Sequence, residues 1–172
     1  NSIKRIEQSY NYMMRGVLEA HEEDLIIISD NDEIPNLNSN KFKNSDKNFF
    51  IFKQLLFYYK FNLFHELMPW FGSKACKKKY LKSFSNLKNL KNKKYPFWRL
   101  DTYLSNIKKT NLDIIEDGGW HFTNIKTPED LYIKMKNFGH HDEFDESKIS
   151  TIDLKDKIEQ GIVFYNHFAD KT

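Results

Sequence analysis

Apolar residues recur at helical spacing near the start of the chain and in short continuous runs further along it. The helical spacing over residues 2–20 predicts an amphipathic helix. Two β-branched runs, residues 25–28 and 112–115, are bounded by polar residues and predict buried strands. Residues 70–76 predict a further strand. The aromatic-rich residues 49–64 predict either two strands or a strand and a helix.

Two later helices are marked by residues that favour helix ends. Thr127 as a cap, Pro128 in the first turn and the acids that follow predict a helix that Gly139 ends. A last helix is predicted over residues 152–160, with Gly161 as its stop. The side chains expected to face the core are those of Leu131, Met135, Phe138, Leu154 and Ile158.

Residues 74–94 contain nine lysines and no acid, which predicts an exposed, mobile, basic loop. Residues 100–107 predict a short helix. Strands alternating with helices indicate an α/β fold with a mainly parallel sheet flanked by helices. No repeat and no linker divides the sequence, so residues 1–172 are expected to form a single domain.

The charge balance of 27 basic and 24 acidic residues gives a formal +3, too small for an electrostatic nucleic-acid binder. Hydrophobic residues make up 40% of the chain, which is enough for a core. No apolar run approaches the roughly 20 residues that cross a bilayer. The single Cys76 excludes an internal disulfide and a multi-thiolate metal site.

The chain begins with Asn and has no leader sequence, so we expect it to be a piece of something longer or a processed product. It also has no Asn-x-Ser/Thr acceptor. Together with the absence of disulfides, these features favour a cytoplasmic rather than a secretory location.

Three acids, Asp30, Asp32 and Glu33, follow the predicted strand at residues 25–28. Ligands of open α/β sheets bind beyond the carboxyl ends of strands. Asp30 and Asp32 can both direct oxygens toward one Mg²⁺ or Mn²⁺ ion that also binds a substrate phosphate. The structural alternative is a turn whose Asp and Asn side chains make local hydrogen bonds.

The second strand end carries Glu116, Asp117, a glycine pair, Trp120 and His121. A carboxylate here can act as a general base, and His121 can bind a metal or orient a substrate. Turn formation and core packing are the structural alternatives. Beyond the helix that follows, His140 is a candidate ligand. His141 next to it is expected to be a solvated histidine at a helix end, where a positive charge is favoured.

Five blocks in order resemble glycosyltransferase family 17, the β-1,4-mannosyl-glycoprotein 4-β-N-acetylglucosaminyltransferase family. They are residues 29–35 (SDNDEIP), 57–62 (FYYKFN), 72–75 (GSKA), 117–122 (DGGWHF) and 138–140 (FGH). The resemblance implies a GT-A type, Rossmann-like fold, a UDP-sugar donor (UDP-GlcNAc first), a glycan acceptor, and inverting transfer assisted by Mn²⁺ or Mg²⁺.

Asp30 and Asp32 match the family's Asp-x-Asp, which implies contact with the cation and the donor diphosphate. Trp120 and His121 match its Gly-Trp-His-Phe block, so Trp120 is expected at the donor, and His140 matches a histidine expected at the metal. Asn31 replaces the small apolar residue more usual between the two aspartates.

Family members have a substantial first half that holds the nucleotide base, whereas only 29 residues precede Asp30 here. The resemblance therefore implies that part of the N-terminal nucleotide-binding half is missing from this chain or lies on another one.

The expected reaction is direct displacement at the anomeric carbon of the donor sugar. Asp117, with Glu116 as the alternative, is the expected base for the acceptor hydroxyl. His121 or His140 would supply a nitrogen ligand or a hydrogen bond to the diphosphate. Lys74 would offset the charge of that diphosphate.

Two other functions are compatible with parts of the sequence. A Mg²⁺-dependent phosphatase also uses Asp-x-Asp after a buried strand, but it usually has Thr or Val where Ile34 stands. A non-catalytic module that binds glycans or nucleic acid would use the basic residues 74–94 and the aromatic residues 49–64.

Overall fold

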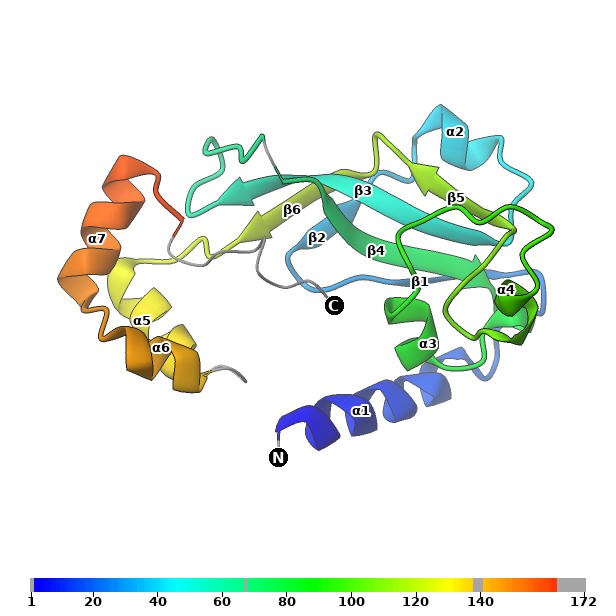
Figure 1. Cartoon of the computed structure of the whole chain (residues 1–172), viewed down its shortest axis with the longest axis horizontal. Helices are drawn as coiled ribbons and strands as arrows, with labels where there is room; N and C mark the ends of the chain where they lie inside the picture. Colours follow the sequence, from blue (N-terminus) through cyan, green and yellow to red (C-terminus); the bar gives the residue numbers. More distant parts are fainter. Residues whose placement is uncertain (1, 67, 138–140, 164–172) are drawn as a thin grey trace. The chain divides into compact units, whose positions relative to one another are not determined.

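A computed structural model describes residues 2–66, 68–137 and 141–163 of the 172-residue chain. The chain divides into two compact units. The first unit lies within residues 1–56 and 66–121, and the second within residues 57–65 and 122–172. Two of the three boundaries fall inside strands, β3 and β6, and the third falls between residues 65 and 66, before β4; Figure 1 shows these strands.

The first unit begins with α1 (Ser2–Met13), which continues as a 3-10 turn (Met14–Val17). Its strands are β1 (Leu25–Ile28), β2 (Glu33–Pro35), β3 (Phe49–Tyr58), β4 (Trp70–Lys77), β5 (Leu112–Ile115) and β6 (Gly119–Thr123), of which β3 and β6 run on into the second unit. Its short helices are α2 (Asn40–Lys43), a 3-10 turn (Lys78–Tyr80), α3 (Phe84–Lys88) and α4 (Asp101–Leu104).

The strands form one mixed sheet in the order β1-β4-β3-β6-β2, with β5 also paired to β3. The β1–β4, β3–β4 and β2–β6 pairs are antiparallel, and the β3–β5 pair is parallel. The prediction of a mainly parallel sheet is therefore wrong. The described residues between β3 and β4, 59–66 and 68–69, form no crossover helix, and such a short connection joins antiparallel neighbours.

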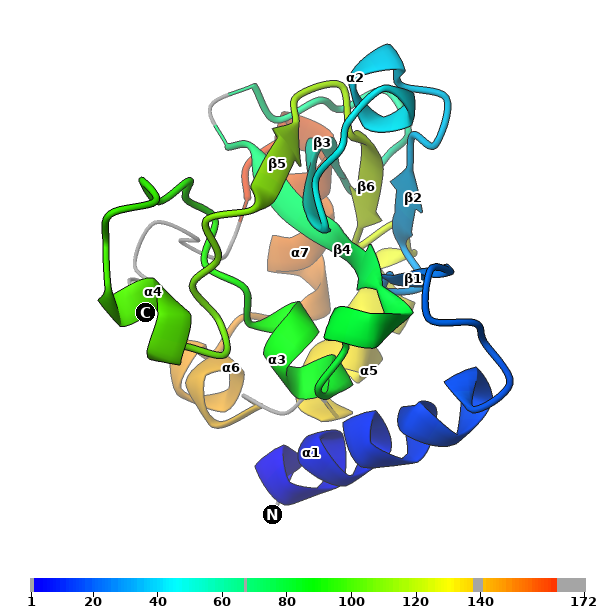
Figure 2. The same ribbon diagram turned by 90° about the vertical axis from the view of Figure 1, so that its right-hand side faces the viewer.

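The sheet is covered on both faces. Successive residues of β3 point to opposite sides, so this strand contributes to the packing on each face. Phe49 and Ile51 pack in one cluster with residues of α3, and Tyr10 of α1 lies against that cluster. Phe50 and Phe52 pack on the other face in a cluster that Phe42 of α2 adjoins. Figure 2 shows α3 beside α1. The α/β class with flanking helices is confirmed.

Residues 74–94 are not a loop. The first part belongs to β4 and a later part forms α3. Lys74 is only 5% exposed, and its ammonium group donates hydrogen bonds to the backbone carbonyls of Lys88 (2.7 Å) and Leu90 (2.8 Å). A lysine that satisfies two carbonyls in this way can be buried in a strand.

The second unit contains α5 (Pro128–Asn137), α6 (His141–Ser147) and α7 (Thr151–Gln160). The Thr127 hydroxyl accepts a hydrogen bond from the N–H of Asp130, which confirms the predicted cap. Gly161 has φ of +68° after α7, as expected for a helix stop. Gly139 and Phe138 lie outside the described residues. The core contains Tyr58, Tyr59, Leu131, Phe144, Leu154 and Ile158, with Met135 packed against it.

Several predicted boundaries need correction. The helix expected over residues 2–20 ends at Met13 and continues only as a 3-10 turn, and that over residues 100–107 is shortened to α4. Residues 49–64 form the single long strand β3 and a return in which Phe57 bridges Phe64. The strands at residues 25–28, 70–76 and 112–115 are confirmed.

No helix in the described parts of the chain is both long enough and apolar enough to span a bilayer. Cys76 is buried as a free thiol.

Candidate functional site

The chain turns sharply where β1 ends, and this turn carries Asp30 and Asp32. The backbone N–H of Glu33 donates to the carbonyl of Asp30 at 3.1 Å, which closes a four-residue turn. The backbone N–H of Asp30 donates back to the Glu33 carboxylate at 3.1 Å, and the Ser29 hydroxyl donates to the Glu33 carbonyl at 3.2 Å. Glu33 therefore fixes the shape of the turn with both its backbone and its side chain.

The Glu33 side chain has no exposed surface. Its carboxylate accepts hydrogen bonds from the indole N–H of Trp70 at 2.9 Å and from the Ser73 hydroxyl at 3.3 Å, both on β4. β2 and β4 are separated by two strands in the sheet order, so these contacts show that the sheet curls. A buried carboxylate requires such donors because burial of a charge is otherwise costly.

Lys88, at the end of α3, adds a positive charge to this group. Its ammonium group lies 2.8 Å from the carboxylate of Asp30 and 3.6 Å from that of Glu33. Burial lowers the pKa of Lys88, but the hydrogen bond to Asp30 and the charge of Glu33 outweigh it, so the net effect is a raised pKa. The sequence alone did not single out Lys88, because nothing in the run of lysines distinguishes it.

His121 completes the group from β6. Its ring stacks on Trp70 with centroids 4.4 Å apart and an angle of 23° between the planes. The side chain is 6% exposed, and its Nδ1 lies 3.8 Å from the carboxylate of Asp32. That nitrogen has no hydrogen-bond partner among the residues that the structure describes. Burial lowers the pKa of His121 although Asp32 and its neighbours act to raise it, which favours a neutral ring.

The pairing of β2 with β6 brings two distant stretches of sequence together. Glu33 is opposite His121 and Pro35 is opposite Gly119 in the register. The acidic turn and the segment around His121 are therefore neighbours in the first unit although 88 positions separate Glu33 from His121. Both belong to blocks that the sequence marked as candidate chemistry.

Two predicted site residues do not join this group, and a third is not among the described residues. Lys74 is engaged with backbone carbonyls in its buried position and not with an anion. Trp120 is next to His121 on β6, so its side chain points to the opposite face, where it is 41% exposed. His140 lies outside the described residues.

Glu116 and Asp117 occupy a different part of the sheet. Glu116 pairs with Lys53 at 2.7 Å, and the carboxylate of Asp117 accepts a hydrogen bond from Ser39 at 2.6 Å. The register places Ile28, Lys74, Ile51 and Ile114 in one row across β1, β4, β3 and β5. Three strand spacings separate the ends of β1 and β5, about 14 Å along the sheet. Among the described residues, the partners found for these two carboxylates are Ser39 and Lys53, and neither belongs to the acidic turn.

The fit of a divalent cation depends on which ligands are free. No three His, Cys, Asp or Glu side chains in the described ranges are arranged as a metal site. Asp30 is bound to Lys88, and Glu33 is bound to Trp70. Asp32 and the Nδ1 of His121 remain as an oxygen and a nitrogen that face each other. These two donors fit a cation that keeps several water ligands, and Asp30 would join them if Lys88 moved away.

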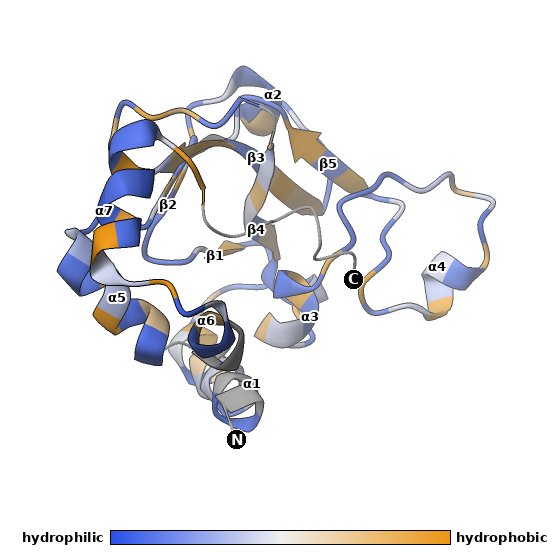
Figure 3. Cartoon of the chain, turned by 60° about the vertical axis from the view of Figure 1, so that its left-hand side comes forward, coloured by the Kyte–Doolittle hydropathy of each residue, from blue (hydrophilic) through white to orange (hydrophobic). Residues whose placement is uncertain are grey.

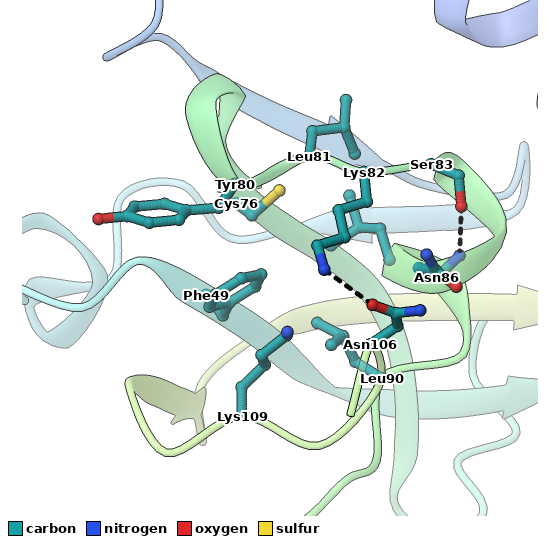
Figure 4. Close-up of a pocket in the computed structure, with 11 residues that line it drawn as sticks. Phe49, Cys76, Tyr80, Leu81, Lys82, Ser83, Asn86, Leu90, Asn106 and Lys109 are labelled. Carbon is teal, nitrogen blue, oxygen red and sulfur yellow. Dashed lines mark hydrogen bonds between the residues drawn. The ribbon is translucent and has the colours of Figure 1, made fainter. Parts of the chain in front are cut away.

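A separate small hollow of about 10 Å³ lies beside α3 and residues 106–109 (Figure 4). Lys82 donates a hydrogen bond to the Asn106 side chain at 3.0 Å, and the Lys109 ammonium lies 5.2 Å from the ring centroid of Phe49. Burial, and then repulsion from Lys82, lower the pKa of Lys109. Among the predicted site residues, only Lys74 is close in sequence to this lining, because it lies on β4 two positions before Cys76.

A scan against protein-family models, a search of curated proteins and a search of solved structures each found no match to this chain. The chemistry of the acidic turn is therefore inferred from its own residues.

Proposed function

We propose that this chain is part of a metal-dependent, inverting glycosyltransferase of GT-A type. Its donor would be a UDP-sugar, UDP-GlcNAc first, and its acceptor a glycan hydroxyl. The observation that carries the proposal is the β2–β6 register, which sets Glu33 of the acidic block opposite His121 of the second block. The resemblance had linked these two blocks by sequence alone.

The charges around the turn suit a diphosphate. Asp32 and the neutral ring of His121 would hold the cation, which neutralises the charge on a departing diphosphate. Lys88 would add a positive charge to that of the cation and would meet a phosphate of the donor bound beside Asp30. Its ammonium group already lies 2.8 Å from the carboxylate of Asp30. Asp30 is free to bind the cation when Lys88 turns to the phosphate.

The transfer itself forms one bond and breaks one. The acceptor oxygen bonds to the anomeric carbon while the bond from that carbon to the diphosphate oxygen breaks, and the leaving UDP keeps the electron pair. The acceptor proton goes to a carboxylate. Asp117 is the proposed base, with Glu116 as the alternative. Both are exposed at the end of β5, apart from the acidic turn, so the donor sugar would have to extend from the turn toward that strand end.

The test compares donor binding and transfer in the unaltered chain and in Asp32→Asn. We expect UDP-GlcNAc to bind in the presence of Mn²⁺ and not without it. Asp32→Asn should lower transfer by at least about a hundredfold, because a charged ligand beside the leaving group is lost. The matched control is Asp156→Asn, an exposed acid of α7, which should transfer normally.

Asp117→Ala separates the two roles. It should slow turnover and leave donor binding unchanged, because Asp117 lies at a different strand end from Asp32. Donor binding that needs neither Mn²⁺ nor Asp32 would contradict the proposal. Release of phosphate from a phosphomonoester, without sugar transfer, would favour the phosphatase alternative.

A further inference from the structure

Residues 91–107, which we call the 91–107 loop, extend from the first unit as an excursion whose two ends lie close together. The backbone N–H of Lys91 donates to the carbonyl of Ile107 at 2.9 Å, which ties the two ends together. Figures 2 and 3 both show this segment, with α4 in it, extending away from the sheet. It is a compact surface excursion of the kind that is often functional.

The 91–107 loop displays large apolar side chains instead of burying them. Five of them within eight positions have between 67% and 93% of their surface exposed. Exposed apolar residues scattered singly need no explanation, but such a cluster marks an interaction surface. These five residues are Phe97, Trp98, Leu100, Tyr103 and Leu104.

The loop has internal structure, so the display is not the result of an unfolded backbone. The Tyr103 hydroxyl donates to the carbonyl of Phe97 at 2.9 Å, and the Thr102 hydroxyl donates to the carbonyl of Arg99 at 2.6 Å. Within α4 the buried residue is the polar Thr102, whereas Leu104 points outward. This is the reverse of the usual orientation of a helix on a protein.

Basic residues accompany the exposed apolar side chains in the sequence. Residues 91–109 contain six basic residues and one acidic residue, Asp101. Asp101 is already paired with Arg99 and Lys108, each at 2.7 Å. Lys91 and Lys93 are exposed at the start of the loop. The loop therefore combines an apolar tip with exposed lysines near its start, of which Lys94 is already paired with Asp113 at 2.6 Å.

We propose that the 91–107 loop docks this protein on an anionic lipid surface. Trp98 and Leu104 would enter the boundary between headgroups and acyl chains, and Lys91 and Lys93 would meet the negative headgroups. A protein partner would suit the aromatic side chains, but lysine is depleted at protein interfaces, so the exposed Lys91 and Lys93 favour an anionic lipid surface. A neutral glycan fits less well because leucine side chains have no ring to stack on sugars and the lysines would have no counter-charge.

The experiment is co-sedimentation of the full chain with vesicles. Vesicles of phosphatidylcholine and phosphatidylserine should bind the chain, vesicles of phosphatidylcholine alone should bind it weakly, and added salt should release it. The variant Trp98→Ser/Leu104→Ser should partition at least about tenfold less, since each side chain leaves water on docking. Both residues are exposed, so the variant should remain folded.

Two matched variants separate the loop from general stickiness. Leu18→Ser removes an isolated leucine that is 75% exposed, and it should bind vesicles as the unaltered chain does. Lys91→Gln/Lys93→Gln should weaken binding to the anionic vesicles only. Trp98→Phe should bind normally but lose the blue shift in fluorescence that docking is expected to produce.

Three results would overturn the proposal. One is equal binding of the unaltered chain and Trp98→Ser/Leu104→Ser to anionic vesicles. Another is concentration-dependent dimerisation that Leu104→Ser abolishes, which would assign the loop to a second copy of the chain. The third is a fluorescence response of Trp98 to oligosaccharides with none to vesicles, which would assign it to sugar binding.

Discussion

At the scale of single residues, the Glu33 carboxylate depends most clearly on its neighbours, because its side chain has no exposed surface and needs hydrogen-bond donors within the protein. Trp70, Ser73 and the backbone of Asp30 donate to it, and Lys88 supplies the nearest positive charge. The sequence pointed to the acids of this turn but assigned the metal to its two aspartates. Which acid is buried depends on β4, and that is a contact between distant residues that no local pattern contains.

Gly72→Ala should destabilise the first unit. A methyl group at this position would lie 2.7 Å from the Trp70 ring and 2.8 Å from the carboxyl carbon of Glu33, and it would collide with Gln54. Because all three side chains are packed together, we expect a loss of about 2–4 kcal/mol in the free energy of unfolding. Denaturant unfolding measures it. Gly16→Ala, with open space around it, is the control, and an equal loss there would show that packing is not the cause.

Lys74 provides a prediction that depends on pH. Burial lowers its pKa from 10.5 to about 8 in the folded chain. Between these two pH values Lys74 holds its proton more often in the unfolded chain than in the folded chain, so its contribution to the free energy of unfolding rises with pH. The buried Cys76 thiol, whose pKa is raised, contributes in the opposite direction, so the contribution of Lys74 is read from the difference between variants. The rise should reach up to about 3 kcal/mol. Lys74→Met should lack it, whereas Lys155→Met should keep it. Parallel urea titrations of the three proteins across this range provide the measurement, and identical slopes would refute the assignment.

At the scale of elements, the sequence predicted those strands and helices whose ends are marked by local residues such as caps, glycines and polar boundaries. Continuous β-branched runs marked β1 and β5, and caps marked α5 and α7. The short strands β2 and β6 were missed because a Glu-Ile-Pro segment and a glycine-led segment become strands only by pairing with each other. Residues 74–94 were wrongly predicted to be a loop because their lysines suggest exposure. Lys74 can be buried only because the carbonyls of Lys88 and Leu90 accept its hydrogen bonds, and this contact is not visible in the local sequence. Direct returns between strands, not visible in periodicity, made the sheet mixed.

Ser150→Ala should weaken α7. The Ser150 hydroxyl accepts a hydrogen bond from the N–H of Asp153, and the Asp153 carboxylate accepts one from the N–H of Ser150. Loss of this reciprocal cap should cost about 1 kcal/mol. Thermal unfolding should show a lower midpoint, with Lys155→Ala on the exposed face of the same helix as the control. A midpoint unchanged by Ser150→Ala would show that the cap does not support the helix.

For the whole molecule, the division into two units predicts how the chain opens. The first unit has its core around β3 and β4, and the second around Leu131 and Leu154. The two cores share β3, which contributes Phe49 and Ile51 to the first and Tyr58 to the second, but the helices that pack on them differ. We therefore expect local unfolding to follow the units and not the chain as a whole.

Leu154→Ala tests this expectation. Leu154 has no exposed surface, so the truncation should cost about 2–5 kcal/mol. Hydrogen exchange followed by mass spectrometry should show faster exchange in α5 and α7, with β1 and β4 little changed. Acceleration of the same size in β1 and β4 would show that the two units unfold as one. Ile152→Ala, at a residue 72% exposed on the same helix, is the control.

The single backbone bond between Lys91 and Ile107 has a practical consequence for protein engineering. Since the two ends already meet there, we expect that replacing the intervening residues with a tight turn or a foreign sequence leaves the sheet in place, at the loss of the ion pair between Lys94 and Asp113 of β5. Shortening such a connection is entropically mild, about 0.6 kcal/mol for each halving of its length. The fold thus contains a natural grafting point.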